Sequence, residues 1–341
     1  MLTFNEIKNF ELNGLDQIDG IRMAARAMAE DHSFNEVKTE EVALVVTELA
    51  TNMIKFAGKG EIMINKFEIN GRKGLDVFGQ DHGPGIENLE ITLRDGYSSV
   101  GSLGVGIGGI KRLSDEFDCF SLMAQHSPRQ VDGFTVFFSR KWAQNKDYLN
   151  NHFELGYISR PFPGEIMNGD HLFIHETASG LIAAVVDGIG HGKEAAFAAQ
   201  TAVEYMAVNT SDSIDEILVG LHQSLMHTRG AVVSVAKFEM DKKQFTYGGI
   251  GNIYARVENS PHPVHPVSLN GTLGSRIGKI RSFEYPWVPG SVLIMSSDGI
   301  SNRWNMEDFP SLIKKHPALI AYVIYHNHCR TNDDASIMII K

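Results

Sequence analysis

The sequence contains little cysteine and no long apolar segment. Two of its 341 residues are cysteine, too few for a disulfide framework, and this favours a reducing compartment such as the cytoplasm. No apolar run approaches the ~20 residues that cross a bilayer. The first residues, MLTFNEIKNFELNGLD, lack the basic and apolar regions of a signal peptide. We therefore expect a cytoplasmic protein without a membrane partner.

An excess of positive charge is also missing. Lysine and arginine total 31 and aspartate and glutamate total 41, which gives a formal net charge of −10. Nucleic acids attract basic protein surfaces, so no nucleic-acid partner is expected. Glycine, by contrast, is frequent, with 33 residues gathered in loops. Such loops let the backbone approach a ligand, often a phosphate.

Several well-known catalytic patterns are absent from the sequence. No Lys-Ser/Thr pair follows the glycines, as it does in a Walker loop. The glycines do not open a βαβ unit, which argues against a dinucleotide-binding Rossmann fold. A serine hydrolase would carry a G-x-S-x-G elbow, which is absent. A zinc site is not expected, because the two cysteines are isolated from each other.

The length suggests two domains, at ~150 residues each. The first half is predicted to run helix, strand, loop, helix, strand, and the polar segment AQNKDYLNNH (143–152) is predicted to link it to the second half. We therefore expect domains at 1–142 and 153–341. Predicted helices are GIRMAARAMAEDHSF, TEEVALVVTELATNMIKFAG, GKEAAFAAQTAVEYMAV and SIDEILVGLHQSLMHT; predicted strands are GEIMINKFEI, KGLDVFGQD, GFTVFFSRKW, GAVVSVAKFEM, QFTYGGIG, SVLIMSSDG and ASIMII.

The second predicted helix carries two polar residues of interest. Its apolar stripe should be buried, and Gly58 should end it. Glu48 and Asn52 lie four residues apart and share a helix face at the edge of that stripe. A carboxylate can remove a proton from a nucleophile, and an amide oxygen can bind Mg²⁺. Taken alone, such a pair is more often a solvated polar pair. The stripe consists of Val42, Val45, Val46, Leu49, Met53 and Phe56.

Two glycine-containing loops follow this helix in the sequence. In QDHGPGIENL, Asp81 comes after a strand; it could accept a hydrogen bond from an adenine amino group, or simply begin a turn. In GSLGVGIGGIKRLSDEFD, glycines precede a helix that we expect to open near Ile110, where free backbone amides would bind phosphate oxygens. The glycines of interest are Gly83, Gly85, Gly101, Gly104, Gly106, Gly108 and Gly109.

These elements together resemble the ATP-binding boxes of the histidine-kinase/gyrase/MutL-type ATPase superfamily. The short distance between the second and third boxes resembles the small RsbT-type anti-sigma-factor kinases, and the similarity extends from Met1 to about Trp142. The resemblance implies an α/β sandwich that binds ATP and Mg²⁺. It implies Glu48 as general base, Asn52 as Mg²⁺ ligand and Asp81 as adenine contact, with loop residues around the nucleotide at Gly83, Gly85, Gly104, Gly106 and Gly108.

Acidic residues of the second half share one placement, at the end of a predicted strand or the start of the next. Strands of a sandwich end on a common rim, so these acids can converge. Clustered carboxylates repel one another unless cations lie between them, and Mg²⁺ or Mn²⁺ suits an all-oxygen site. Two such ions can activate a water and hold a phosphate. Each acid alone could be an ordinary turn residue. They are Asp170, Asp187, Asp298 and the pair Asp333/Asp334.

The second half resembles the SpoIIE-type branch of metal-dependent serine/threonine protein phosphatases, and in particular its small RsbX-type members. The similarity covers about Phe153 to Lys341, through segments such as NGDHLFIHETASGLIAAVVDGIGHGKEA and SVLIMSSDGISN. It implies an α-β-β-α sandwich with two metal ions and a catalytic, bridging Asp187. Unlike the larger phosphatases of this superfamily, the sequence has no separate early arginine that would bind phosphate, although Arg160 lies in about the right region. His191 could protonate a leaving seryl oxygen or contact phosphate, but is more readily explained as a residue that lines the loop. The implied metal ligands are Asp170, Asp187, the Gly188 carbonyl, Asp298 and Asp333, the last chosen over Asp334.

The sequence thus predicts an α/β (α+β) signalling protein of bacterial partner-switching. An ATP-dependent serine/threonine kinase-like domain would precede a Mn²⁺- or Mg²⁺-dependent phosphatase domain. The resemblance implies a STAS-domain phosphoprotein as client, such as an anti-sigma-factor antagonist or a stressosome-like protein, and leaves a homodimer possible. Two alternatives stay open: a first half that senses nucleotide or docks a partner without kinase activity, and a non-catalytic scaffold.

Overall fold

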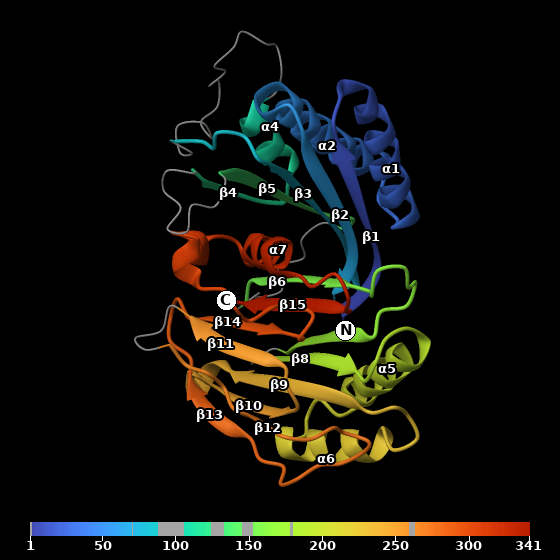
Figure 1. Ribbon diagram of the computed structural model, residues 1–341, viewed down its shortest axis with the longest axis vertical. Helices are drawn as coiled ribbons and strands as arrows, with labels where there is room; N and C mark the ends of the chain where they lie inside the picture. The colour runs from blue at the N-terminus through green and yellow to red at the C-terminus, as the bar shows by residue number, and fades with distance from the viewer. Residues whose placement is uncertain are drawn as a thin grey trace. The chain divides into compact units, whose positions relative to one another are not determined.

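The structure is a computed structural model that describes residues 2–69, 71–87, 106–123, 133–144, 153–177, 180–258 and 263–341 (Figure 1). The chain forms two compact units. The N-terminal unit comprises Phe4–Leu149 together with Asn305–Leu319, and the C-terminal unit comprises Met1–Thr3, Asn150–Trp304 and Ile320–Lys341. In the described part of the chain, no helix has the length and apolar character needed to cross a membrane.

The N-terminal unit is built on a sheet with the strand order β1-β2-β3-β5-β4. The strands predicted at GEIMINKFEI, KGLDVFGQD and GFTVFFSRKW are confirmed as β2, β3 and β5. Strands β1 and β4 were not predicted; the apolar residues of β1 have no regular alternation along LTFNEIKNFEL. The bounds are β1 Leu2–Leu12, β2 Gly60–Ile69, β3 Arg72–Asp81, β4 Glu116–Leu122 and β5 Phe134–Trp142.

Helices α1 (Ile18–Asp31), α2 (Glu36–Ala57) and α4 (Gly106–Leu113) share one core with residues of β2 and β3. Asn35 caps α2 by accepting a hydrogen bond from Lys38 N at 2.9 Å, and Gly58 ends it with φ 78°, as predicted. The predicted stripe is buried up to Met53. Phe56 is 53% exposed, so the prediction was wrong for it, because periodicity fixes a side chain's direction but not what lies opposite.

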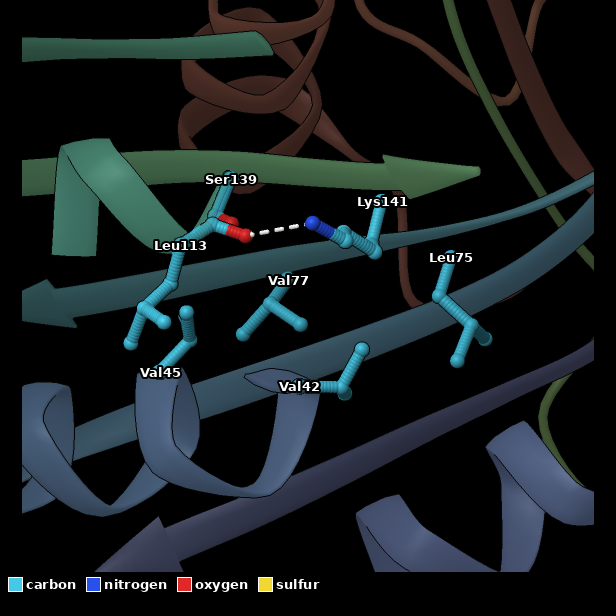
Figure 2. A pocket seen from close by; sticks show the side chains of 7 residues that line it. All are labelled: Val42, Val45, Leu75, Val77, Leu113, Ser139 and Lys141. Carbon is cyan, nitrogen blue, oxygen red and sulfur yellow. Dashed lines mark hydrogen bonds between the residues drawn. The ribbon is translucent and has the colours of Figure 1, made fainter. Parts of the chain in front are cut away.

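Helix α4 begins at Gly106, not near Ile110 as expected. Glycine inside a helix costs about 1 kcal/mol relative to alanine, and burial of Gly109 and Ile110 offsets that cost. The small gap between α4, α2 and the sheet is apolar, and Lys141 closes it by donating a hydrogen bond to the Leu113 carbonyl at 2.9 Å (Figure 2). This gap belongs to the core and has no space for a ligand.

The segment Asn305–Leu319 completes the N-terminal unit, although it follows most of the phosphatase-like sequence. It contains short 3-10 turns at Met306–Asp308 and Leu312–Lys314. Phe309 lies against Phe134 of β5, with ring centroids 6.4 Å apart, and His316 stacks on Phe138 at 4.6 Å. The structure therefore differs from the linear division expected from the sequence in this segment. Most of the expected linker lies outside the described residues, and its position stays a prediction.

The C-terminal unit contains a sheet of strand order β12-β10-β9-β8-β7, with β13 beside β10, and a second sheet of order β11-β14-β15-β6. Strands β6 and β15 of the second sheet lie against β7 of the first. The bounds are β6 Leu155–Arg160, β7 Asp170–Thr177, β8 Gly180–Gly188, β9 Ala231–Glu239, β10 Gln244–Ile250, β11 Tyr254–Glu258, β12 Ser268–Leu269, β13 Phe283–Pro286, β14 Val292–Ser296 and β15 Ala335–Ile340.

Helices α5 (Lys193–Val208) and α6 (Ile214–Ser224) lie beside the first sheet (Figure 1). Their buried residues share one core with residues of β8 and β9. Both helices were predicted, and the predicted sandwich of packed sheets and helices is confirmed. Helix α7 (Pro317–His328) was not predicted. Its residues from Ala318 to Tyr325 are all buried, so PALIAYVIYHNH is apolar on every side and shows no helical periodicity.

Candidate functional site

Asp170 and Asp187 lie directly opposite one another in the C-terminal unit. Asp170 begins β7, Asp187 comes one residue before the end of β8, and the two are partners in the antiparallel register. Opposed residues of antiparallel strands have Cβ atoms about 4.5–5.5 Å apart, where like charges repel. Asp170 is buried and Asp187 is half-buried. The strand-end placement predicted from the sequence thus brings two carboxylates face to face.

The electrostatics of this pair show which other acids lie near it. Burial raises the pKa of Asp170, and the neighbouring charges of Asp334 and Asp333 raise it further. Burial raises the pKa of Asp187 as well, and the charges of Asp170, Asp298, Asp333 and Asp334 add to the effect. The sequence-predicted acids therefore share one electrostatic neighbourhood. Cations placed among them would relieve this repulsion.

The acids of the second sheet's strand ends differ in their surroundings. Asp298 follows β14 and accepts a hydrogen bond from Asn252 Nδ2 at 2.9 Å. Asp333 is half-buried and accepts one from Asp334 N at 3.0 Å. Asp334 is buried, and its Oδ1 accepts bonds from Phe162 N at 2.8 Å and Gly169 N at 3.0 Å. Asp334 thus connects its own loop to the backbone at Phe162 and Gly169. The role of Asp333 as a metal ligand stays a prediction.

The donor set fits hard divalent cations. It consists of carboxylates, and such all-oxygen sites suit Mg²⁺ or Mn²⁺. Among the described residues, Asp334 Oδ2 is buried without a hydrogen-bond partner, an unsatisfied acceptor in this acidic neighbourhood. Within the same part of the chain, these acids do not form a group whose ligand atoms all lie within 4.8 Å of one another.

Gly188 follows Asp187 and has no room for a side chain. A Cβ atom there would lie 2.2 Å from the Ala195 carbonyl oxygen at the start of α5. Its N–H donates to the Gly169 carbonyl at 3.0 Å, which links the loop after β8 to the loop before β7. The close packing explains the glycine, and its own carbonyl as metal ligand stays a prediction.

Arg160 and His191 lie beside this site in different settings. Arg160 Nη2 donates to the Arg330 carbonyl at 2.7 Å and to the Asp333 carbonyl at 3.3 Å, so the guanidinium holds the loop that leads to Asp333. His191 is exposed, stacks on Phe162 at 4.4 Å and lies 3.2 Å from Glu165 Oε1. These contacts place the His191 ring on the loop, and a contact of His191 with phosphate stays a prediction.

Sequence reasoning missed the residues that support these acids. Ser297 Oγ donates to Asp170 Oδ2 at 2.5 Å, although 127 positions separate the two residues. Asn252 supports Asp298 in the same manner. No spacing rule reveals such pairs, because the partners meet only when strands of different sheets pack together. The one sequence signal was the serine next to Asp298 in SSDG.

The candidate nucleotide site lies in the N-terminal unit. Glu48 and Asn52 both lie on α2 and are half-buried. Asp81 ends β3, and its Oδ1 accepts a bond from Gly83 N at 2.9 Å. Burial raises the pKa of Asp81, while that bond lowers it. Asp81 therefore begins a turn, as the alternative prediction had it. The hydrogen bond of this turn uses Asp81 Oδ1 and does not involve Oδ2.

A row of hydroxyl groups that the sequence analysis missed accompanies Asp81. Thr135 of β5 is its partner in the strand register. The Thr135 hydroxyl lies 2.9 Å from Ser121 Oγ, and Ser121 accepts a bond from Ile86 N at 2.8 Å. Gly85 has φ 83°, a conformation that favours glycine. The loop after β3 is thereby fixed against β4 and β5.

The glycines of the second loop are described in part. Gly106 and Gly108 lie in the first turn of α4, and the first backbone amides of a helix have no partner within the helix itself. Gly101 and Gly104 lie outside the described residues. The structure thus places Gly106 and Gly108 at a helix start, and their contact with nucleotide stays a prediction.

Family models match both halves of the chain. A histidine kinase-like ATPase domain matches residues 13–124, and the stage II sporulation protein E (SpoIIE) family matches residues 177–341. The first half is similar to the serine/threonine-protein kinase RsbT of Bacillus subtilis (strain 168), at 38% identity over 110 residues. That match covers 32% of this chain and 83% of RsbT.

The second half is similar to the phosphoserine phosphatase RsbX of the same organism, at 26% identity over 167 residues. This match covers 49% of the chain and 82% of RsbX. A solved structure from work on the bacterial stressosome matches 55% of this chain and 99% of its own, with 25% identity and a TM-score of 0.53. A structure of RsbX in complex with magnesium matches 57% of this chain and 98% of its own at 22% identity, with a TM-score of 0.51, and shows the shared fold. The chain therefore belongs to the family of RsbT-related histidine kinase-like ATPases through its first half, which it joins to a SpoIIE-type phosphatase domain homologous to RsbX.

Proposed function

We propose that the chain is a bifunctional partner-switching enzyme. Its C-terminal unit would remove phosphate from phosphoserine or phosphothreonine with Mn²⁺ or Mg²⁺, and its N-terminal unit would transfer phosphate from ATP. The client would be a STAS-domain protein. The similarity to a serine/threonine kinase, to a phosphoserine phosphatase and to a stressosome structure supports this combination.

The facing pair Asp170 and Asp187 carries the phosphatase part of the proposal. These two carboxylates would bind metal from the first sheet, together with the Gly188 carbonyl, and Asp298 and Asp333 would bind it from the second. The charges of Asp170, Asp298, Asp333 and Asp334 all raise the pKa of Asp187, which supports Asp187 as one of the residues that would hold the metal. Bound ions would lower the pKa of a water and neutralise phosphate charge.

The kinase part rests on the N-terminal unit. Glu48 would act as general base, Asn52 would hold Mg²⁺, and Asp81 would accept a hydrogen bond from adenine. Thr135 and Ser121 would fix the Asp81 loop through their hydroxyl groups. Loop glycines Gly83, Gly85, Gly104, Gly106 and Gly108 would surround the nucleotide.

One experiment tests both parts. A STAS-domain protein is incubated with the full chain, first in its phosphorylated form with Mn²⁺ and then unphosphorylated with ATP and Mg²⁺, and its intact mass is read. We expect a loss and a gain of one phosphate, and no loss with Asp187→Asn. Dephosphorylation that proceeds fully in excess chelator would overturn the metal mechanism. ATP binding without any phosphate gain would instead indicate a nucleotide-sensing N-terminal unit.

A further inference from the structure

A chain of hydrogen-bonded side chains, buried except for the half-buried Asn168, ends on Asp170. Asn168 Nδ2 donates to Ser159 Oγ at 2.6 Å, and Ser159 Oγ lies 2.6 Å from Ser336 Oγ. Ser336 N donates to Ser297 Oγ at 3.0 Å, and the Ser336 side chain lies near enough to the Asp170 carboxylate to lower its pKa. Ser297 reaches the same carboxylate directly, at 2.5 Å. The Ser159 oxygen accepts from Asn168 and its hydroxyl hydrogen is available to Ser336, although either serine can be the donor in that pair.

The same network holds the backbone that carries Asp170. Asp170 N donates to Asn168 Oδ1 at 3.0 Å, which closes a ring of hydrogen bonds. Gly169 N donates to Asp334 Oδ1 at 3.0 Å. Ser159 lies on β6, Ser336 on β15 and Ser297 just after β14, all in the second sheet, whereas Asp170 begins a strand of the first sheet. The ring therefore joins the two sheets at the rim where the acids meet.

This location has a consequence for the metal site. Asp170 and Asp187 belong to the first sheet, while Asp298 and Asp333 flank strands of the second. The distance between the first pair of carboxylates and the second pair is therefore set by the distance between the two sheets at this rim. We propose that Ser159, Ser297 and Ser336 are positioning residues that fix this spacing and orient Asp170, so that the site binds Mn²⁺ or Mg²⁺ tightly. The proposal rests on the proposed metal-dependent phosphatase function.

Hydroxyl groups are required here because they donate and accept at once. Ser297 Oγ donates to Asp170 Oδ2 and accepts from Ser336 N at 3.0 Å, so its truncation removes the partner of that oxygen and of that N–H. Ser297 and Ser336 have no exposed surface, so bulk water does not replace the lost group. Residues that orient metal ligands in this way typically change metal affinity 10–100-fold when mutated.

The test is a Mn²⁺ titration of the full chain by calorimetry. Ser297→Ala and Ser336→Ala should each weaken Mn²⁺ binding by about 10–100-fold. Ser159→Ala, one step further from the carboxylate, should have a smaller effect. Ser234→Ala is the matched control, because Ser234 is equally buried and accepts a bond from the Tyr247 hydroxyl at 2.8 Å on β9, outside the network.

Unfolding of each variant in chelator separates positioning from a general loss of stability. The control should lower the stability of the metal-free chain while leaving the Mn²⁺ dissociation constant unchanged. Wild-type Mn²⁺ affinity in Ser297→Ala, Ser336→Ala and Ser159→Ala overturns the proposal, as does an equal loss of affinity in the control. If the wild-type chain itself binds no Mn²⁺, the proposed function fails first, and the two failures are distinguishable. Should one variant fail to fold, the others still decide the result.

Discussion

Glu116 and His316 are 200 positions apart in the sequence and are joined by a hydrogen bond of 3.0 Å between Glu116 Oε2 and His316 Nε2. His316 Nδ1 accepts a bond from Ala318 N at 3.1 Å, so Nε2 carries the proton that it donates to Glu116. Asp118, two residues along β4, accepts a second bond from His316 N at 2.7 Å. These contacts fasten Asn305–Leu319 to strand β4 within the N-terminal unit.

The Glu116 contact predicts a pH dependence of stability. Burial alone would raise the pKa of Glu116, but the Arg140 charge and hydrogen bonds from His316 and Trp142 hold it well below its usual range. An acid with a depressed pKa in the folded state stabilises the fold above its unfolded pKa, and this contribution is lost as the pH falls. Glu116→Gln should lower the free energy of unfolding at pH 7 by about 1–3 kcal/mol.

The measurement is denaturant unfolding between pH 7 and pH 3. The difference between wild type and Glu116→Gln should shrink as the pH falls through the unfolded pKa of about 4.3 and below. Glu30→Gln serves as control, since Glu30 is exposed and its nitrogen–oxygen distance to Arg26 is 3.8 Å, an ion pair worth under about 1 kcal/mol. A pH-independent difference for Glu116→Gln would contradict the assignment.

The composition of the N-terminal unit predicts how fragments behave. A fragment that ends near Lys146 lacks Asn305–Leu319, the segment that packs on Phe134 and Phe138. It should expose these aromatic side chains and aggregate more readily than the full chain. A synthetic peptide of residues 305–319 should bind the fragment and raise its solubility, measured by light scattering. A peptide with Phe309→Ala and His316→Ala should not; equal rescue by both peptides would argue against the packing.

Asp187→Asn should change the stability of the protein in opposite directions without and with metal. The pKa of Asp187 is raised by burial and by its acidic neighbours, so its charge destabilises the metal-free fold at neutral pH, and stability should rise as the pH falls. Asp187→Asn should therefore stabilise the chelated protein by about 1 kcal/mol or more. Mn²⁺ at 100 times its dissociation constant should stabilise the wild type by about 2.7 kcal/mol and the variant far less. Thermal melts with chelator and with Mn²⁺ measure both; destabilisation of the chelated variant would refute the repulsion.

The sequence predicts those features of the fold and of the candidate site that depend on residues close together in the chain. Strand-end placement was enough to predict that Asp170 and Asp187 converge, because strand direction and period are local properties. Helix α7 escaped prediction, because a helix buried on all sides has no apolar stripe. Ser297 and His316 escaped as well: each contacts a residue more than 100 positions away, and only packing between distant strands and loops reveals such a partner.

The proposed roles of Glu48 and Asp81 can be distinguished by measuring ATP binding and phosphoryl transfer separately. A base is needed for phosphoryl transfer but not to hold adenine. Glu48→Ala should keep ATP affinity within a few-fold and reduce transfer by about 100-fold or more. Asp81→Asn should weaken ATP binding itself, because its carboxylate would no longer accept from adenine. Calorimetry with ATP and a phosphotransfer assay supply the two measurements, and an equal loss of affinity in both variants would contradict the assignment.

The last prediction concerns communication between the two proposed activities. A kinase and a phosphatase that acted on one serine at the same time would together yield only ATP hydrolysis. Asp81 lies opposite Thr135 on β5. Phe134, which directly precedes Thr135, contacts Phe309 of the segment Asn305–Leu319. In the sequence, that segment lies between Asp298 and Asp333. A nucleotide that shifts β5 would thus act on a segment whose two ends lead to candidate metal ligands. Coupling free energies of about 1–3 kcal/mol correspond to 5–150-fold effects.

We therefore expect a non-hydrolysable ATP analogue to change the phosphatase rate at fixed free Mn²⁺, by about 5-fold or more. Asp81→Asn should lose this response because the analogue no longer binds. Phe309→Ala should bind the analogue and Mn²⁺ as the wild type does, yet respond less, because the contact with β5 is removed. Rates that are identical with and without the analogue in the wild type would exclude nucleotide coupling and favour separation of the two activities by client. A full response in Phe309→Ala would place the coupling in another part of the chain.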